Sequence, residues 1–486
     1  MSLARNTLFV SLANFCTTLS NLALTIGLAW LLIDKEDFGK VQQLFMIASF
    51  TLSILSGFPT GLSYFYGFHK SYSDRVKLFK KFVLSMLIGL GVICIGIFAF
   101  KNVIAVSFEN NLIIHYFFLF IGIVFLKALT SYFVNYFAII KKTDKLFIIN
   151  FSYFIFIMAF LTLLWLKKEL VSIELILVYI LLLEIVKMIF CFLFIMKYLK
   201  VKGELLINKK EFLYILPITG VTLLNTLYVF IDKYMISVML NPKAYAEYQV
   251  GAFIIPFVGI ITGSIMVTLL PVFSKLSKEE KFSEIVSILK ETTKKTTLLL
   301  IPIFCYCLIF GKELIISVYS EKYSFSGEIF KIYTLRFFTT VILFSITMAS
   351  IGLQNWVVLT AFISLVLNVI LNYFFILNYE VMGAVYATII TGYLGIILPI
   401  YLINKKLKTK FLNYFPLKEY AFIVLTSILV AYIMYFIAFK ILMLSGVWSL
   451  FMAGFYYFII LLFSNKLFKV FEMKNLFENL RSKIGI

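Results

Sequence analysis

The sequence predicts an all-α, polytopic membrane protein with about 14 transmembrane helices. Hydrophobic residues make up 62% of the 486 residues and charged residues only 14%, with a mean hydropathy of +1.01. The apolar runs are about 20 residues or longer, which is the length of a helix that crosses a hydrocarbon core about 30 Å thick. They also lack the alternation of polar and apolar residues that barrel strands require. Since backbone polar groups in lipid must bond within their own segment, the runs are expected to be helices.

Fourteen apolar segments follow one another along the chain. The first is expected to remain as a membrane helix, because the charged run Asp34–Asp37 stands where a signal peptide would have its small-residue cleavage site. The segments cover residues 6–33, 41–67, 78–100, 112–139, 146–166, 171–196, 212–239, 246–273, 296–319, 327–352, 356–377, 381–402, 417–439 and 446–468.

The net charge of +20 has a topological explanation. With the N-terminus inside, the cytoplasmic loops hold 30 of the 44 basic residues and the outer loops hold ten, while the acidic residues outside the membrane divide evenly. Lys and Arg collect on the cytoplasmic side of membrane proteins. We therefore expect a multi-pass protein of the bacterial inner (plasma) membrane with both termini in the cytoplasm, and no nucleic-acid partner.

The polar break at residues 197–211 suggests how the chain is organised. It predicts a six-helix lobe over residues 1–199, a cytoplasmic linker over 200–211, and a second six-helix lobe over 212–405 around a shared central cavity. Two extra helices and a basic cytoplasmic tail would occupy 406–486. The entry to the second helix of each lobe is faintly similar, at an offset of 207 residues: Asp37–Gln42 reads DFGKVQ and Ala244–Gln249 reads AYAEYQ. Repeated bundles with a site between them are common among secondary transporters.

Ionisable residues inside the predicted segments are candidates for function, because each is costly in a membrane unless it is paired or hydrated. They are Lys127, Glu184, Lys187, Asp232, Lys233 and Arg336. The excess of basic residues favours an anionic substrate, and we expect the four basic side chains to bind a diphosphate. The two carboxylates are candidates for a coupling proton or sodium ion. The competing interpretation is structural, with buried ion pairs Lys127–Glu184 and Asp232–Arg336.

Polar residues recur at helical spacing in four segments, three of which also carry a charge. We interpret them as the lining of a hydrated cavity that receives a sugar; the alternative is interhelical hydrogen bonding worth about 0.6 kcal/mol for each bond. In the first, fourth and seventh segments the candidates are Asn14, Asn21, Ser131, Asn135, Asn225 and Tyr228. The tenth segment carries Arg336, Thr340, Thr347, Ser350 and Gln354 along one expected face.

No pattern of an enzyme, cofactor or metal site is present in the sequence. The five cysteines lie within apolar runs, and His69 and His115 stand far apart. No phosphate-binding glycine loop or nucleophile–base set occurs. We therefore expect a protein without a cofactor that is not an enzyme. Its transport would be passive, coupled to an ion or driven by the membrane potential.

Three stretches carry a family resemblance. They are the turn Leu31–Gln42, the run Ile231–Ser237 that continues into Tyr245–Pro271, and the pair Leu367–Asn372 and Gly383–Thr388. In this order they resemble the polysaccharide transporter branch of the multidrug/oligosaccharidyl-lipid/polysaccharide (MOP) exporter superfamily, to which O-antigen (Wzx-type) flippases belong. The resemblance covers residues 6–405, and the last two segments match in hydropathy only. Glu380 departs from it, since members often have glycine before the Gly-Ala step.

The resemblance implies two six-helix lobes around a central cavity, and Asp232 as the motif aspartate. The expected function is to flip a polyprenyl-diphosphate-linked oligosaccharide, an O-antigen, capsule or exopolysaccharide repeat unit, across the inner membrane by alternating access. A polysaccharide polymerase and glycosyltransferases are the expected protein partners. The alternatives are a multidrug/cation antiporter of the same superfamily and a peptidoglycan-precursor (lipid II) flippase. A membrane-embedded glycosyltransferase or polymerase would need a large outer loop, which the sequence lacks.

Overall fold

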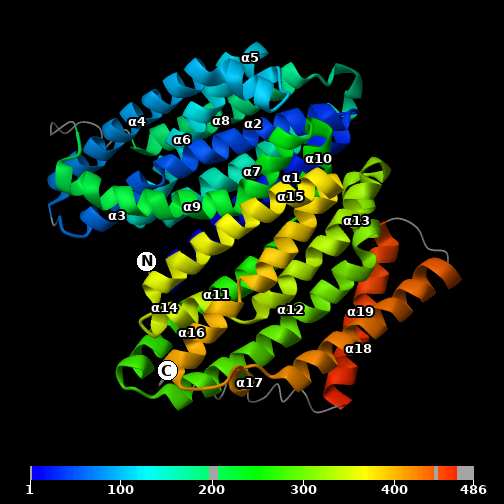
Figure 1. The fold of residues 1–486 in the computed structure, drawn as a ribbon. Coiled ribbons are helices and arrows are strands. Elements are labelled where there is room, and N and C mark those ends of the chain that lie inside the picture. The colour runs from blue at the N-terminus through cyan, green and yellow to red at the C-terminus, as the bar shows by residue number, and fades with distance from the viewer. Residues whose placement is uncertain (1–2, 70, 196–205, 443–446, 468–486) are drawn as a thin grey trace. The chain divides into compact units, whose positions relative to one another are not determined.

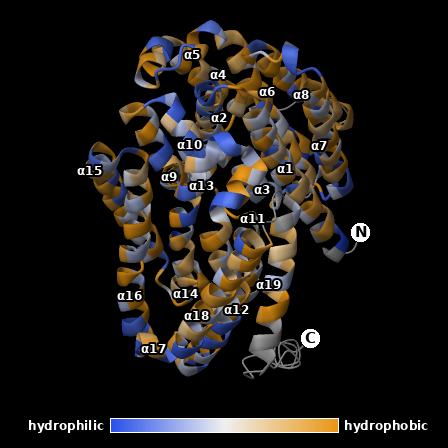
Figure 2. Ribbon diagram, turned by 90° about the vertical axis from the view of Figure 1, so that its right-hand side faces the viewer, coloured by the Kyte–Doolittle hydropathy of each residue, from blue (hydrophilic) through white to orange (hydrophobic). Residues whose placement is uncertain are grey.

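The computed structural model describes residues 3–69, 71–195, 206–442 and 447–467, and within these ranges the chain forms helices and no strands. Eleven helices of this part are long and apolar enough to cross a membrane. Figure 2 shows that hydrophobic residues predominate along their length. The predicted all-α, polytopic membrane fold is therefore confirmed. Part of the predicted linker (200–205) and nearly all of the basic tail (468–486) lie outside the described residues.

The chain divides into two compact units, Met1–Gln249 and Val250–Ile486, and each is described by itself. In the first unit (blue to green in Figure 1), α1 packs along α7, α6 along α8, and α9 along both α2 and α3. Its helices are α1 (Leu3–Leu31), α2 (Lys35–Leu55), α3 (Gly57–Tyr66), α4 (Tyr72–Ser107), α5 (Leu112–His115), α6 (Phe117–Ile139), α7 (Thr143–Leu166), the 3₁₀ turn η1 (Lys168–Leu170), α8 (Ile173–Ile195), α9 (Lys209–Met239) and α10 (Pro242–Gly251), which ends in the second unit.

The second unit is arranged around α12, which packs against α11, α13, η4, α17, α18 and α19. Figure 1 shows α12 crossing this unit beside α18. The elements are α11 (Pro256–Lys278), α12 (Phe282–Tyr319), η3 (Glu321–Tyr323), α13 (Ser324–Tyr333), the 3₁₀ helix η4 (Thr334–Val341), α14 (Phe344–Ser350), α15 (Gln354–Leu394), α16 (Ile397–Leu407), α17 (Phe411–Tyr414), α18 (Leu417–Phe436), the π-helical turn η5 (Ile437–Ile441) and α19 (Val447–Leu467).

Each predicted apolar segment coincides with helix, but several are interrupted. The fourth is divided at Tyr116, between α5 and α6, and the twelfth is divided after Leu394, between α15 and α16. The second divides at Ser56 into α2 and α3. The eighth is not continuous over 246–273, because α10 ends at Gly251 and α11 begins at Pro256. The tenth changes from α-helix to 3₁₀ helix at Thr334. Hydropathy averaged over a segment does not reveal these breaks, because each lies within a run that is apolar overall.

The predicted lobe boundary and the boundary of the compact units differ. The sequence places residues 212–239 in the second lobe, whereas α9 packs on α2 and α3 and belongs to the first unit, which continues to Gln249. A polar break in the sequence marks where the chain leaves the membrane. It carries no information about which neighbours the next helix contacts.

The start of α9 is fixed to α4 by a buried ion pair. The side chain of Asn208 and that of Glu211 form a capping box, in which each accepts a backbone N–H of the other. Lys81 Nζ lies 2.9 Å from Glu211 Oε2, and both side chains are only 8% exposed. Ser85 Oγ also accepts the N–H of Ile207 at 2.9 Å. The described end of the predicted linker is therefore anchored on α4.

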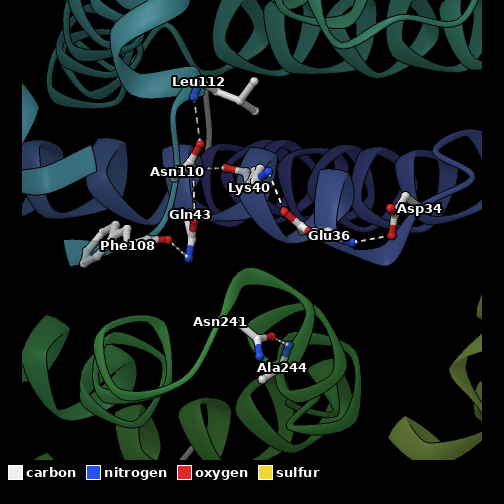
Figure 3. A network of polar contacts seen from close by, with 9 residues as sticks. All are labelled: Asp34, Glu36, Lys40, Gln43, Phe108, Asn110, Leu112, Asn241 and Ala244. Carbon is white, nitrogen blue, oxygen red and sulfur yellow. Dashed lines mark hydrogen bonds and ion pairs between the residues drawn. The ribbon is translucent and has the colours of Figure 1, made fainter. Parts of the chain in front are cut away.

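The faint sequence repeat corresponds to two helix starts that contact each other. Asp34 caps α2 by accepting the N–H of Glu36 at 3.0 Å, and Asn241 accepts the N–H of Ala244 at 2.9 Å at the start of α10 (Figure 3). The two capping residues are separated by 207 residues, the offset of the repeat. Lys35 Nζ then joins the two helices through an ion pair with Glu247 at 2.7 Å.

Gly39 allows these two helices to touch. A Cβ at this position would lie 1.9 Å from the carbonyl oxygen of Pro242 and 3.4 Å from Cβ of Ala246. Tyr245 also donates its hydroxyl to the carbonyl of Gln42 at 3.4 Å. The glycine of the DFGKVQ stretch is therefore required for close backbone approach.

A buried amide network continues this contact. Asn110 donates to Gln43 Oε1 and to the carbonyl of Lys40, both at 2.9 Å (Figure 3). Gln43 in turn donates to the carbonyl of Phe108 at 3.2 Å and to Ser237 Oγ at 3.3 Å. Gln43 and Asn110 are fully buried. The network ties α2 to the loop after α4 and to the end of α9.

The glycine of the Gly383–Thr388 motif has a similar role in the second unit. A Cβ on Gly383 would lie 2.0 Å from the carbonyl oxygen of Phe375. The chain reverses between them at Glu380, whose φ of 50° interrupts α15. Because this φ favours glycine, the geometry explains why glycine is common there and why Glu380 is a strained departure.

We expect Gly39→Ala to lower the stability of the protein by about 1–3 kcal/mol, because a backbone carbonyl cannot move aside as a side chain would. The matched control is Gly96→Ala in α4, where a Cβ would meet no atom within 4 Å. Thermal unfolding of both purified variants in detergent measures the difference. Equal melting temperatures for the two would contradict the close approach.

Candidate functional site

Glu184 on α8 is the buried centre of a polar cluster in the first unit. Its side chain has 0% exposure. Oε1 accepts the hydroxyl of Tyr153 on α7 at 2.9 Å, and Oε2 accepts the hydroxyl of Thr130 on α6 at 3.1 Å. A buried carboxylate needs such donors to offset its lost hydration. Three helices therefore meet at this one side chain.

Two lysines flank this carboxylate without forming a close ion pair. Lys127 on α6 interacts electrostatically with Glu184 and with Lys187 of α8. Its Nζ lies 5.3 Å from the ring centroid of Phe45, and that of Lys187 lies 4.5 Å from the ring of Tyr153. Among the described residues, no carboxylate oxygen comes within 4.0 Å of either lysine. In place of the Lys127–Glu184 ion pair of the competing interpretation, the structure has hydroxyl and cation–π contacts.

We call Lys127, Thr130, Tyr153, Glu184 and Lys187 the Glu184 cluster. It brings together three of the six ionisable residues predicted from the sequence. Its formal charge is +1, because two lysines share one carboxylate. Both lysines are half-buried.

Asp232 lies apart from this cluster, on α9. It is 5% exposed and accepts the hydroxyl of Tyr248 on α10 at 2.8 Å. The neighbouring Lys233 is half-buried, with Nζ 5.4 Å from the ring centroid of Phe230. The motif aspartate therefore joins α9 to α10, in the same part of the unit as the Gly39 contact.

Most of the residues predicted to bind sugar lie on uncovered faces of their helices. Asn14 and Asn21 are exposed on α1, Ser131 and Asn135 on α6, and Asn225 on α9, while Tyr228 is half-buried. This argues against the alternative that they bond to neighbouring helices. The contact of Asn135, for example, is local, since its side chain donates to the carbonyl of Ser131 at 2.9 Å. Polar faces of this kind are unfavourable against lipid and suit a hydrated surface.

Arg336 belongs to the second unit and lies in the 3₁₀ helix η4. Its guanidinium donates to the hydroxyl of Tyr333 and lies 5.2 Å from that ring centroid and 5.9 Å from that of Phe337. Arg336 is half-buried, whereas Phe337 is 5% exposed. The expected single polar face of the tenth segment is wrong, because the break after Val341 turns Thr347 into the core, where it donates to the Leu343 carbonyl.

Several functional candidates have no local sequence signal. Tyr153 and Thr130 hold Glu184, Tyr248 holds Asp232, and Lys81 pairs with Glu211. Each partner comes from another helix, and only the Asn208-x-x-Glu211 capping pattern can be read from the sequence. Within the described ranges, no group of three or more His, Cys, Asp or Glu residues is arranged to hold a metal ion.

Comparison with known proteins relates the sequence to a protein family. The sequence profile of the family described as "Polysaccharide biosynthesis protein" matches residues 3–277. No curated protein sequence matches the chain at a significant level.

Solved structures share the fold at low sequence identity. "Lipid II flippase MurJ, inward closed conformation" aligns with a TM-score of 0.68 and 19% identity, over 95% of this chain and 99% of that one. An inward-facing multidrug resistance MATE family transporter of the MOP superfamily gives a TM-score of 0.61 and 13% identity, over 81% and 96%. A MOP superfamily transporter from Pyrococcus furiosus, whose binding pocket is described as reversed in polarity, gives 0.54 and 14%, over 84% and 96%. The chain therefore has the fold of MOP-superfamily transporters.

We expect Tyr153→Phe to reduce the free energy of unfolding by about 1–3 kcal/mol, because it leaves one oxygen of a buried carboxylate without its donor. Tyr179→Phe is the matched control. Its ring stacks on Phe160 at 3.7 Å, and its hydroxyl has no partner among the described residues. Denaturation of the purified variants in detergent compares them, and losses of equal size would show that the Glu184 contact contributes nothing specific.

Proposed function

The chain belongs to the polysaccharide biosynthesis protein family, and from that premise we propose that it is a flippase for a polyprenyl-diphosphate-linked oligosaccharide. The substrate would be an O-antigen, capsule or exopolysaccharide repeat unit, moved from the inner to the outer leaflet of the bacterial inner membrane by alternating access. The transporter fold and the multi-pass membrane architecture support this assignment over an enzyme.

The observation that carries the proposal is the positive charge of the Glu184 cluster. Lys127 and Lys187 are half-buried, share one buried carboxylate, and have aromatic rings rather than close carboxylates beside their ammonium groups. An ammonium group in an apolar environment gains most from an anionic partner. A diphosphate would supply that partner while it is bound, whereas a cationic drug would be repelled.

We propose that Lys233 of the first unit and Arg336 of the second unit are further basic residues that contact the diphosphate during transport. The fork of a guanidinium matches phosphate oxygens, and an ammonium group contributes a point charge. The exposed polar faces that carry Asn14, Ser131 and Asn225 support a hydrated path for the sugar. The prenyl chain would remain in the lipid.

Coupling to an ion would change the net charge of the Glu184 cluster. We propose that Glu184 or Asp232 takes up a proton or a sodium ion. Neutralising Glu184 would leave Lys127 and Lys187 without their nearby negative charge and so strengthen the binding of an anion. Release of the ion would weaken that binding and favour release of the substrate. A polymerase and glycosyltransferases would act on either side of this step.

Two alternatives use the same fold. A lipid II flippase would carry a substrate with the same diphosphate chemistry, and deletion of its gene would be lethal by lysis, whereas loss of a surface polysaccharide is usually tolerated. A multidrug/cation antiporter would need an acidic binding surface, and the Glu184 cluster has the opposite sign.

We expect Lys127→Ala and Arg336→Ala each to reduce transport at least about 10-fold, because each removes a charged contact with the diphosphate. The assay is delivery of the glycan in cells that lack the native gene, at matched protein levels, followed by flipping of the purified lipid in proteoliposomes. Arg336→Lys, which keeps the charge but loses the fork, should be intermediate.

Lys168→Ala is the matched control, because Lys168 is exposed in η1 and its ammonium lies over Trp165. It should transport normally. Normal glycan delivery by Lys127→Ala and Arg336→Ala would reject the diphosphate role.

The topology follows from the distribution of basic residues and can be measured by labelling. In a cysteine-free background, Ile33→Cys should react with a membrane-impermeant maleimide in intact spheroplasts, since Ile33 is 95% exposed before α2. Lys278→Cys, at the exposed end of α11, should react only after the membrane is permeabilised. The opposite pattern would place the termini outside.

A further inference from the structure

The 3₁₀ helix η4 is unusual for its length and place. It runs for eight residues, Thr334–Val341, within a candidate membrane span, and extended backbone at Ile342 separates it from α14. Runs of 3₁₀ helix beyond three or four residues are uncommon, and one in the middle of a helix often marks a hinge or a strained functional segment. Some part of the surrounding structure must therefore hold it.

Two tyrosines from other helices bond to the backbone of η4. Tyr393, near the end of α15, donates its hydroxyl to the carbonyl of Leu335 at 3.1 Å. Tyr420, in the first turn of α18, donates to the carbonyl of Phe338 at 3.3 Å. These two carbonyls flank the stretch that carries Arg336.

Two threonines of η4 bond to the carbonyls in between. Thr339 donates to the carbonyl of Arg336 at 3.0 Å, and Thr340 donates to that of Phe337 at 2.6 Å. Four successive carbonyls, 335 to 338, thus accept a side-chain hydroxyl. In an apolar environment these hydroxyls satisfy backbone carbonyls that lack the regular hydrogen bonds of an α-helix.

The buried side of η4 is fixed by aromatic packing. The ring of Phe304 on α12 lies 5.7 Å from that of Phe337 and 5.8 Å from that of Phe338. Three residues form one turn of a 3₁₀ helix, so Arg336 and Thr339 share the half-buried face. An α-helix over the same residues would turn Arg336 by about 40° relative to Thr334.

We propose that Tyr393 and Tyr420 are positioning residues that hold η4 in its 3₁₀ form and thereby aim Arg336 at the substrate diphosphate. The proposal rests on the proposed function. It gives α18, one of the two helices beyond the twelve of the two predicted lobes, a part in substrate handling. Neither tyrosine needs to touch the substrate, because each acts on the backbone on either side of Arg336.

The test measures initial flipping rates in proteoliposomes against the concentration of two probes, a polyprenyl-diphosphate oligosaccharide and its monophosphate analogue. The variants are Tyr393→Phe and Tyr420→Phe, which keep the rings. We expect each to raise the KM for the diphosphate lipid about 3- to 10-fold, the effect of one hydrogen bond. The KM for the monophosphate lipid should change less, because a misdirected guanidinium loses most where it binds two phosphates.

Tyr401→Phe in α16 and Tyr432→Phe in α18 are the matched controls. Their side chains are 58% and 59% exposed. Both should retain the KM of the unsubstituted protein for each lipid. Melting temperatures of all variants separate a change in substrate binding from a loss of folded protein, and if one tyrosine variant does not fold, the other decides the test.

The decisive comparison repeats both tyrosine substitutions in the Arg336→Ala background. If the tyrosines act through Arg336, they should change KM less than about 2-fold there. An undiminished effect in that background, or wild-type KM values in the single variants, overturns the positioning role. If Arg336→Ala itself transports normally, the diphosphate role proposed for Arg336 fails first, so the two failures are distinguishable.

Discussion

The buried carboxylates of Glu184 and Asp232 accept hydrogen bonds from hydroxyls on other helices, and Glu184 is the clearest case. It is fully buried, and its two oxygens are satisfied by hydroxyls from α6 and α7. Water is excluded there, so these helices cannot separate without leaving a charge unsolvated. The same carboxylate partly balances Lys127 and Lys187, which connects the stability of the bundle to the charge available for an anion.

The contact between α2 and α10 shows the same constraint at a helix end. Close approach at Gly39 brings the first turns of the two helices together, and their polar groups are then satisfied by the Lys35–Glu247 ion pair and by the amides of Gln43 and Asn110. The repeated sequence supplies two similar helix starts. Their contact explains why one of them carries glycine where the other carries Ala246.

The backbone departs from the regular α-helix at the segment that carries Arg336 and at the chain reversal in α15. The 3₁₀ helix η4 carries Arg336, and hydroxyls from two other helices bond to its carbonyls. The turn at Glu380 depends on the absence of a side chain at Gly383. Arg336 and three threonines lie in η4, and a glutamate stands at the turn, yet neither polar stretch by itself dictates the irregular backbone, which tertiary contacts maintain.

The sequence by itself determined the membrane class, the order of the helices and the identity of the intramembrane charges, because hydropathy, loop charge and helical spacing are local quantities. It also suggested Lys127 and Glu184 as neighbours, through the ion pair of the competing interpretation. Only the tertiary structure decided that Glu184 bonds to Tyr153 and Thr130, that Asp232 bonds to Tyr248, and that the tenth segment is broken. Those outcomes depend on which helices pack together. Local sequence patterns do not show which residues far apart in the chain will be in contact.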